Sequence, residues 1–159
     1  MTLRSAQPQD AAAIATIWNA VIRDTLATFT TVEKEATALA KQIAGEPNRW
    51  HVAEVDGQVV GFACYFQFRG GPGYARAMEF SVHLAPEARG KGLGRKLLEQ
   101  LEAAASAEGA HTLYGGVSSA NPEGAAFHEK CGFERLATLP EVGRKNDQWL
   151  DLHLYQKFL

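Results

Sequence analysis

Arg89-Gly90-Lys91-Gly92-Leu93-Gly94 is the stretch from which the rest of this chain can be interpreted. Its glycines lie between an apolar run suited to a strand, residues 77–84, and a strongly periodic helical run, residues 95–108. Glycine permits positive φ and a close approach of the backbone to a ligand. The N-terminus of the following helix adds unpaired N–H groups and the positive end of the helix dipole. The stretch therefore predicts an anion site, and the basic residues around it favour phosphate.

The spacing of the glycines excludes two common phosphate-binding loops. A dinucleotide fingerprint needs a third glycine where Arg95 and Leu97 stand, and no Walker sequence occurs in the chain. A glycine-rich connection that binds nothing is the simplest alternative. The hexapeptide thus predicts a phosphate ligand of another kind.

The composition restricts the classes of partner. The 159 residues are 46% hydrophobic and 21% charged, with a formal net charge of −2, which is typical of one globular domain. This charge argues against a broad nucleic-acid-binding face. No apolar run approaches the roughly 20 residues of a membrane span, and the start lacks the apolar core of a signal peptide. The two cysteines, and five histidines without metal-ligand spacing, predict a reducing, cytoplasmic location and no metal.

Hydrophobic periodicity predicts an α/β fold of the α+β kind in a single domain, residues 1–159. Asp56-Gly57 between two apolar runs is a hairpin signal, and the glycine-rich stretch connects a strand to a helix as in a βαβ unit. That combination implies a mixed sheet of about seven strands with about four helices on both faces. The expected strands are residues 3–6, 50–55, 58–68, 74–84, 112–117, 133–139 and 149–158, and the expected helices are residues 11–21, 33–43, 95–108 and 122–131.

The hexapeptide after an extended strand resembles the pyrophosphate-binding motif of the GNAT acyltransferases, whose glycine-rich turn grips the diphosphate of acetyl-coenzyme A. The stretch from Asn121 to Phe133, which includes Phe127 and Glu129, is similar to that family's pattern near the acyl end. The order of elements is also that of the GNAT fold over nearly the whole chain. The resemblance implies an acetyl-CoA-dependent acetyltransferase. The cofactor-binding residues that it implies are Val82, Leu84, Arg89, Gly90, Lys91, Gly92, Leu93, Gly94, Arg95 and Asn121.

Two of these residues have an expected place in the chemistry. If the strands splay as in GNAT enzymes, the backbone N–H of Val82 should point at the thioester oxygen, and its side chain should belong to the core. Asn121 should contact the cofactor near its thiol end. An asparagine before Pro122 is equally a good start for a helix.

Further features are similar to one branch, the phosphinothricin N-acetyltransferase-like family. The strand Glu79–Leu84 resembles that family's E-x-S-V-Y-V, His128 stands where most GNAT members have tyrosine, and residues 141–152 resemble its C-terminal pattern. Three residues depart from the branch, since His83 replaces a tyrosine, Phe80 a residue that is usually polar and Asp147 a glycine. His83 and Phe80 flank the expected active site, so they bear on the acceptor more than on the chemistry.

Glu79 and His128 are the candidate catalytic residues. A carboxylate facing a partly dry pocket can have a raised pKa, so Glu79 could be the general base, directly or through a water. The alternative is a solvated strand residue or an ion pair with Arg76. His128 could titrate near neutral pH, although a lone helical histidine is more often structural. The resemblance implies that Glu79 is the base and that His128 either protonates the departing sulfur or shares the base role.

The resemblance also implies an acceptor pocket that includes Phe29, Phe68, Arg69 and Tyr74. Arg69 could pair with a substrate carboxylate through two hydrogen bonds, or it could be a loop arginine exposed to water. The favoured acceptor is the amine of a small amino acid or analogue of the phosphinothricin or methionine sulfoximine kind. Acetylation of a protein N-terminus or lysine, a non-catalytic acyl-CoA-binding module and a nucleotide-binding protein are the alternatives. A homodimer is implied by analogy, and no nucleic-acid or membrane partner is expected.

Overall fold

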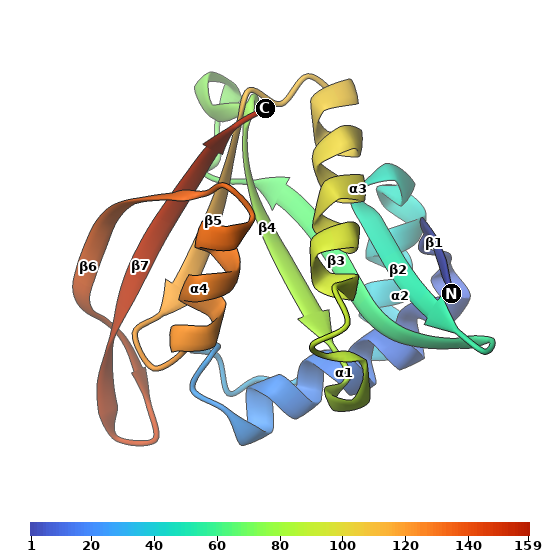
Figure 1. Ribbon diagram of the computed structural model, residues 1–159, viewed down its shortest axis with the longest axis horizontal. Coiled ribbons are helices and arrows are strands. Elements are labelled where there is room, and N and C mark those ends of the chain that lie inside the picture. The colour runs from blue at the N-terminus through green and yellow to red at the C-terminus, as the bar shows by residue number, and fades with distance from the viewer.

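The computed structural model describes residues 1–159 as a seven-stranded sheet flanked by helices (Figure 1). The strands are β1 (Thr2–Ser5), β2 (Trp50–Val55), β3 (Gln58–Gln67), β4 (Ala77–Leu84), β5 (Thr112–Ser118), β6 (Glu134–Lys145) and β7 (Gln148–Phe158). The α-helices are α1 (Ala11–Asp24), α2 (Ala36–Gly45), α3 (Leu93–Ala107) and α4 (Pro122–Lys130). The strand order is β1-β2-β3-β4-β5-β7-β6, and only β4 and β5 are parallel. The predicted mixed sheet with helices is confirmed.

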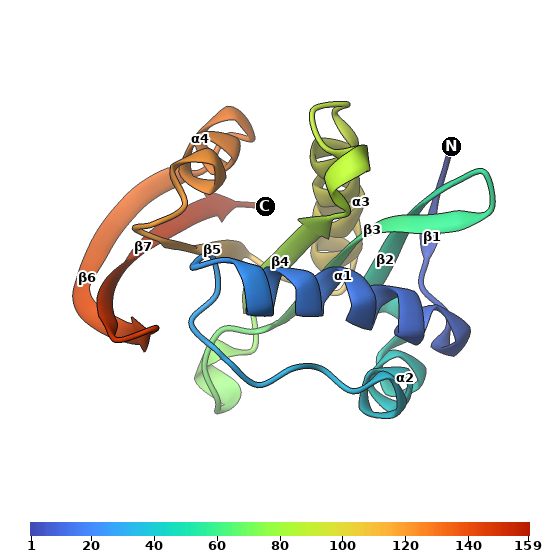
Figure 2. The same ribbon diagram turned by 90° about the horizontal axis from the view of Figure 1, so that it is seen from below.

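The helices form a layer on each face of the sheet (Figure 2). On one face, Leu97 and Leu101 of α3 are fully buried in a core cluster that also contains Met78. On the other face, Ile14 of α1 and Ile43 of α2 are fully buried in a second cluster. These are the apolar stripes at helical spacing, which can only be buried against the sheet. None of the helices combines the length and the apolar character needed to cross a membrane.

Several element boundaries differ from the expected ones; strand β4, for example, begins at Ala77 rather than at residue 74, because Pro72–Tyr74 form a short 3-10 helix. Helix α2 begins at Ala36 rather than at residue 33, because Glu35 has an extended backbone with φ −100° and ψ 132°. Strand β6 continues past the expected end at residue 139 as far as Lys145. Pro140 does not end it, because β6 is an edge strand and its register shifts between Leu139 and Gly143.

The parallel pairing of β4 with β5 ends early, and this creates the space for a site. The strands pair only at Ala77–Thr112, Met78–Leu113 and Glu79–Tyr114. Beyond Glu79 they diverge (Figure 1), while β4 stays paired with β3 as far as Leu84. The C-terminal half of β4 therefore has one edge without a neighbouring strand.

Candidate active site

A cleft of about 740 Å³ lies in the gap between the diverging strands. Phe80 and Val82 line it, and so do Ser81 and His83. Because side chains alternate along a strand, these two pairs point to opposite faces of the sheet, so the cleft opens on both. Its other walls come from the start of α3, the start of α4, the end of α1 and the loop that follows α1.

The glycine-rich loop turns into α3 through left-handed backbone conformations. Gly90 and Gly92 have φ values of +72° and +76°, and Gly92 caps α3 without any side-chain hydrogen bond. A Cβ atom at either position would meet nothing within 4 Å, so the positive φ rather than crowding requires glycine there. At Gly94, by contrast, a Cβ would lie 3.3 Å from the ring of Phe127. The uncapped N–H groups of α3 thus lie beside the cleft, an arrangement that suits an anionic group.

The free edge of β4 offers backbone groups to the cleft. Ala85 N–H donates to Val60 O at 2.8 Å, and in this antiparallel register alternate residues of β4 direct their amides toward β3. Val82 and Leu84 are the residues between, so their N–H and C=O groups point into the gap. Arg89 Nε donates to Leu84 O at 3.4 Å. The splay on which the expected position of the Val82 N–H depends is therefore present.

Helix α4 brings Asn121 and His128 to the cleft. Asn121 Oδ1 accepts a hydrogen bond from Gly124 N–H at 3.0 Å, so this residue caps the helix as well as lining the cleft. His128 Nδ1 lies 2.7 Å from Gly124 O. Because a carbonyl oxygen only accepts, Nδ1 carries the proton. Burial lowers the pKa of His128, which favours the neutral ring, and in the neutral ring Nε2 is a bare acceptor.

The position of the His128 ring is fixed by tight packing. The side chain stacks on Phe80, with ring centroids 5.2 Å apart, and lies 5.3 Å from the ring of Tyr155 and 5.7 Å from that of Phe133. On the β5 side it is held against Gly115, where a Cβ would lie 2.5 Å from His128 Cδ2. The missing side chain at residue 115 is what leaves room for the imidazole.

Glu79 lies at the closed end of the gap, as the last β4 residue paired with β5. Its neighbours across the sheet are Phe66 and Tyr114. Since Phe80 packs on His128, Glu79 points to the opposite face, and it does not line the cleft. The structure thus places Glu79 and His128 on opposite faces of β4. Burial raises the pKa of the Glu79 carboxyl.

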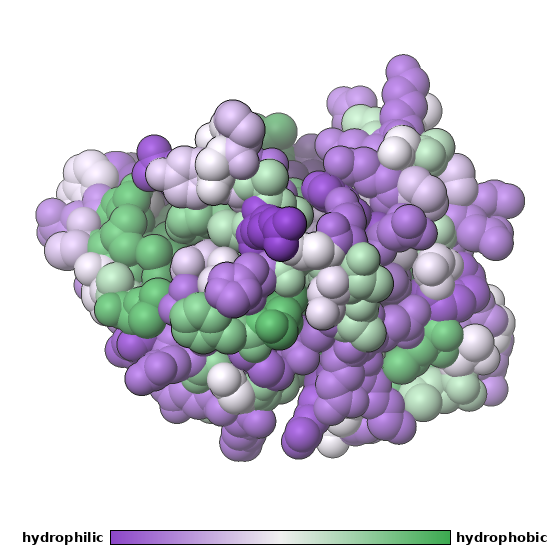
Figure 3. All heavy atoms as spheres, turned by 90° about the horizontal axis from the view of Figure 1, so that it is seen from above, coloured by the Kyte–Doolittle hydropathy of each residue, from purple (hydrophilic) through white to green (hydrophobic).

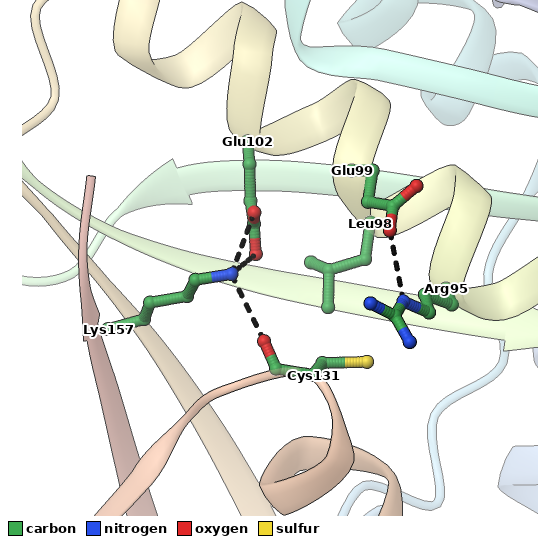
Figure 4. A pocket seen from close by; sticks show the side chains of 6 residues that line it. All are labelled: Arg95, Leu98, Glu99, Glu102, Cys131 and Lys157. Carbon is green, nitrogen blue, oxygen red and sulfur yellow. Dashed lines mark hydrogen bonds and ion pairs between the residues drawn. The ribbon is translucent and has the colours of Figure 1, made fainter.

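The expected cofactor-binding residues divide into two groups. Those that line the cleft are Val82, Leu84, Arg89, Gly90, Gly94 and Asn121. Of the others, Leu93 is only 4% exposed, so only its backbone is available, and Gly92 acts through its conformation. Lys91 is exposed outside the cleft. The Arg95 guanidinium turns to Glu99, with Nε 3.0 Å from Oε1, and borders a separate small cavity (Figure 4).

The expected acceptor residues Phe29, Phe68, Arg69 and Tyr74 all lie outside the cleft. Phe68 stacks on Tyr114 with ring centroids 4.5 Å apart, and Tyr114 is the β5 partner of Glu79. The side chains of Phe68, Tyr114 and Glu79 therefore form one group on the α1 face of the sheet. This group is close to the gap without being part of its wall.

The remaining acceptor candidates have other neighbours. The Arg69 guanidinium carbon lies 5.6 Å from the ring centre of Tyr74, and both side chains are exposed. The ring of Phe29 lies against Gly143 of β6. Phe29 directly follows residues 25–28, which line the cleft, so the backbone connects it to the site.

Several cleft residues carry no recognisable motif and are not expected from the sequence. Thr25, Leu26, Ala27 and Thr28 form the wall that follows α1. His83 lies between Trp18 and Phe62, at centroid distances of 5.9 and 5.5 Å, and burial lowers its pKa to about 4. Its departure from the family tyrosine is the one signal in the sequence that could have identified it.

Comparison with known proteins agrees with this geometry. Residues 15–133 match the model of the acetyltransferase (GNAT) family. The chain is 37% identical to the L-methionine sulfoximine/L-methionine sulfone acetyltransferase of Salmonella typhimurium, over 98% of this chain and 93% of that protein. The structure resembles the ribosomal-protein-alanine N-acetyltransferase of Brucella melitensis, with a TM-score of 0.94, 35% identity and full coverage of both chains.

A further similar structure is the phosphinothricin acetyltransferase of Sinorhizobium meliloti in complex with acetyl-CoA. Its TM-score is 0.92 at 31% identity, over 99% of this chain and 88% of that one. Such identities over almost the whole chain, together with the glycine loop, the splayed strands and the cleft, lead to one assignment. The chain belongs to the acetyltransferase (GNAT) family.

Proposed function

We propose that this acetyltransferase moves an acetyl group from acetyl-CoA to the amine of a small amino acid or analogue of the methionine sulfoximine or phosphinothricin kind. The observation that carries the proposal is the gap through the sheet, with the Val82 N–H in it and Glu79 at its closed end. The names of the Salmonella and Sinorhizobium relatives support this donor and this class of acceptor.

The donor side fits the residues around the glycine loop. Gly90, Gly94 and the uncapped start of α3 suit a diphosphate, and Arg89 adds a positive charge beside them. Acetyl-CoA, when bound, supplies an acetyl thioester and leaves as a thiol. The free N–H of Val82 would donate to the thioester oxygen, where one such donor is worth about 3–4 kcal/mol.

The acceptor side requires a group that removes a proton from the amine. Glu79 fits this role on the α1 face, because burial raises the pKa of its carboxyl toward the working pH. On the other face, the protonated Nδ1 of His128 is held by Gly124 O, which leaves Nε2 able to accept a proton but not to donate one. We therefore assign His128 to accepting a proton from the attacking amine; the imidazolium formed in this way can then pass that proton to the departing sulfur, so that CoA leaves as a thiol. A carboxylate on the acceptor would pair with Arg69, beside Phe68 and Tyr74.

A panel of acceptors tests the proposal. Methionine sulfoximine, phosphinothricin, a simple alkylamine and a peptide with an N-terminal alanine are compared by release of the CoA thiol. The amino-acid analogues should give the highest kcat/KM. Preference for the peptide would favour protein acetylation, the second candidate, which the name of the Brucella neighbour supports. Binding of acetyl-CoA without turnover of any acceptor would leave a non-catalytic acyl-CoA-binding module.

We also propose a homodimer in the cytoplasm. Viewed from above, apolar residues gather on the side that β6 and β7 occupy (Figure 3). Leu136, Val142 and Trp149 of these strands are each more than half exposed. Exposed apolar side chains that gather in one patch are typical of a protein–protein interface. The thiols of Cys64 and Cys131 are unpaired, as in a reducing compartment. Light scattering tests the dimer, and Trp149→Ser should shift the mass toward the monomer.

A further inference from the structure

We propose that Lys145 is a positioning residue for acceptor binding, because its ammonium group fixes the loop of residues 25–29 that forms one wall of the cleft. The inference rests on the proposed function in so far as that wall faces the acceptor. Lys145 is the last residue of β6 and only 4% exposed. A lysine is almost never buried to this extent unless its charge is well solvated by the protein.

The Lys145 ammonium is solvated by oxygens of a single short segment. Nζ donates to Ile22 O at 2.7 Å, to Thr25 O at 2.8 Å and to Thr28 O at 2.9 Å, and it lies 3.3 Å from Thr28 Oγ1. An ammonium group has three N–H donors, so these carbonyls use all of them. Burial lowers the pKa of Lys145, and the carbonyl dipoles compensate for the missing water.

The position of Lys145 also explains how α1 can end at Asp24 without leaving its last carbonyl groups unpaired. The last carbonyls of a helix have no partner inside it and carry the negative end of its dipole. Ile22 O is one of them, since α1 ends at Asp24. A cation brought from β6 satisfies this carbonyl together with those of the loop. The loop therefore takes its shape from a residue more than 110 positions away in the sequence.

A second contact holds the same loop to the same strand. Gly143, two residues before Lys145, is buried under the ring of Phe29, and a Cβ there would lie 2.5 Å from Phe29 Cδ2. Residues 143 and 145 point to the same face of β6, as the alternation of a strand requires. Gly143 holds the loop by packing against Phe29, and Lys145 holds it by hydrogen bonds. The residues held by these contacts, Thr25 to Thr28, line the cleft without any regular secondary structure of their own.

Loss of the ammonium should therefore release one wall of the cleft and leave the others in place. The glycine loop, α3 and the free edge of β4 make no hydrogen bond with Lys145. Donor affinity should thus be retained while acceptor binding weakens. A merely structural role would lower stability without this difference between the two substrates.

The test compares Lys145→Met with Lys157→Met. Lys157 is a matched control, because its Nζ also donates to a backbone carbonyl, Cys131 O, at 3.0 Å and lies 2.9 Å from Glu102 Oε1 (Figure 4). It borders the small cavity and no part of the cleft. We expect both variants to unfold more easily. Only Lys145→Met should raise the KM for methionine sulfoximine, by about tenfold or more, with the Kd for acetyl-CoA within about twofold of the wild type.

Hydrogen exchange of the ligand-free protein provides a readout that needs no activity. In Lys145→Met the amides of residues 22–30 should exchange faster, whereas in Lys157→Met they should not. Equal KM values for the two variants, or unchanged exchange in Lys145→Met, would overturn the proposal. If Lys145→Met does not fold, Lys145→Gln is used in the same comparison. Failure of the proposed function would show separately, as a wild-type protein that acetylates no amino-acid analogue.

Discussion

Replacement of Gly115 by alanine should displace the imidazole of His128, which we propose to act in catalysis, without changing its chemical structure. A Cβ at residue 115 would lie 2.5 Å from His128 Cδ2 and 3.0 Å from Phe80 Cε1. Ordinary contact begins at 3.4 Å, and His128 Nε2 would lie closer to the new Cβ than Cδ2 does, so the ring must move by at least about 0.9 Å, which is 3.4 minus 2.5. The ring cannot rotate away freely, since Phe80, Phe133 and Tyr155 surround it.

The expected cost follows from overpacking and from misplacement. Overpacking of a core lowers the free energy of unfolding by about 1–3 kcal/mol, and a shift of about 1 Å can reduce turnover by up to roughly 10²-fold. We expect Gly115→Ala to lower Tm by about 2–4 °C for each kcal/mol and to lower kcat by roughly 10- to 100-fold. Calorimetry and steady-state kinetics with methionine sulfoximine measure the two effects.

A glycine elsewhere and a double variant complete the experiment. Gly45→Ala is the control, because a Cβ at this position at the end of α2 would meet nothing within 4 Å. Adding His128→Ala to Gly115→Ala should recover part of the lost stability, since the smaller side chain removes the clash. If Gly115→Ala keeps the wild-type kcat, the reasoning that places His128 in the chemistry is refuted.

Four further outcomes are expected. Glu79→Gln should reduce turnover by roughly 10²–10⁴-fold with an unchanged Kd for acetyl-CoA by calorimetry, and near-normal turnover at every pH would make Glu79 structural. Burial raises the pKa of the Glu79 carboxyl in the folded state, so protonation of this carboxyl favours folding. Its contribution to the free energy of unfolding is present below the pKa of the unfolded state and is lost as pH rises through the pKa of the folded state. Glu79→Gln should therefore unfold at a higher denaturant concentration than the wild type at pH 7 but not at pH 3.5. Gly92→Val should lose acetyl-CoA binding because φ is +76° there, whereas Gly92→Asn, which tolerates that conformation, should retain most of it by the same titration. Arg69→Ala should raise the KM for acceptors that carry a carboxylate and leave a simple alkylamine unaffected, and equal losses for both would indicate a stability effect instead.

Features set by neighbours in the sequence could be predicted, and features set by distant contacts could not. The Asp56-Gly57 hairpin forms as expected because φ values of 50° and 77° at two adjacent residues are a local requirement. The glycine loop was recognisable for the same reason. The continuation of β6 through Pro140 was not, because it depends on β6 being an edge strand.

The same distinction holds within the site. Arg95 is predicted to bind the cofactor, and in the structure its side chain pairs with Glu99, a partner that the spacing of a single helical turn already offers. The neighbours of Gly115 and Lys145 come from other elements, so their roles appear only once the chain is folded. The departure of His83 from the family tyrosine draws attention to a residue that lines the cleft, but it does not reveal that the residue is enclosed by Trp18 and Phe62.

The splay of β4 and β5 has a consequence for the order of kinetic events. A cleft that opens on both faces of the sheet lets the two substrates enter by separate routes and meet in the middle. Neither Cys64 nor Cys131 lines it, so no thiol is placed to carry an acetyl group between two half-reactions. Initial-rate plots should therefore intersect rather than run parallel. Coenzyme A, which would leave by the donor's route, should inhibit competitively against acetyl-CoA and not against the amine.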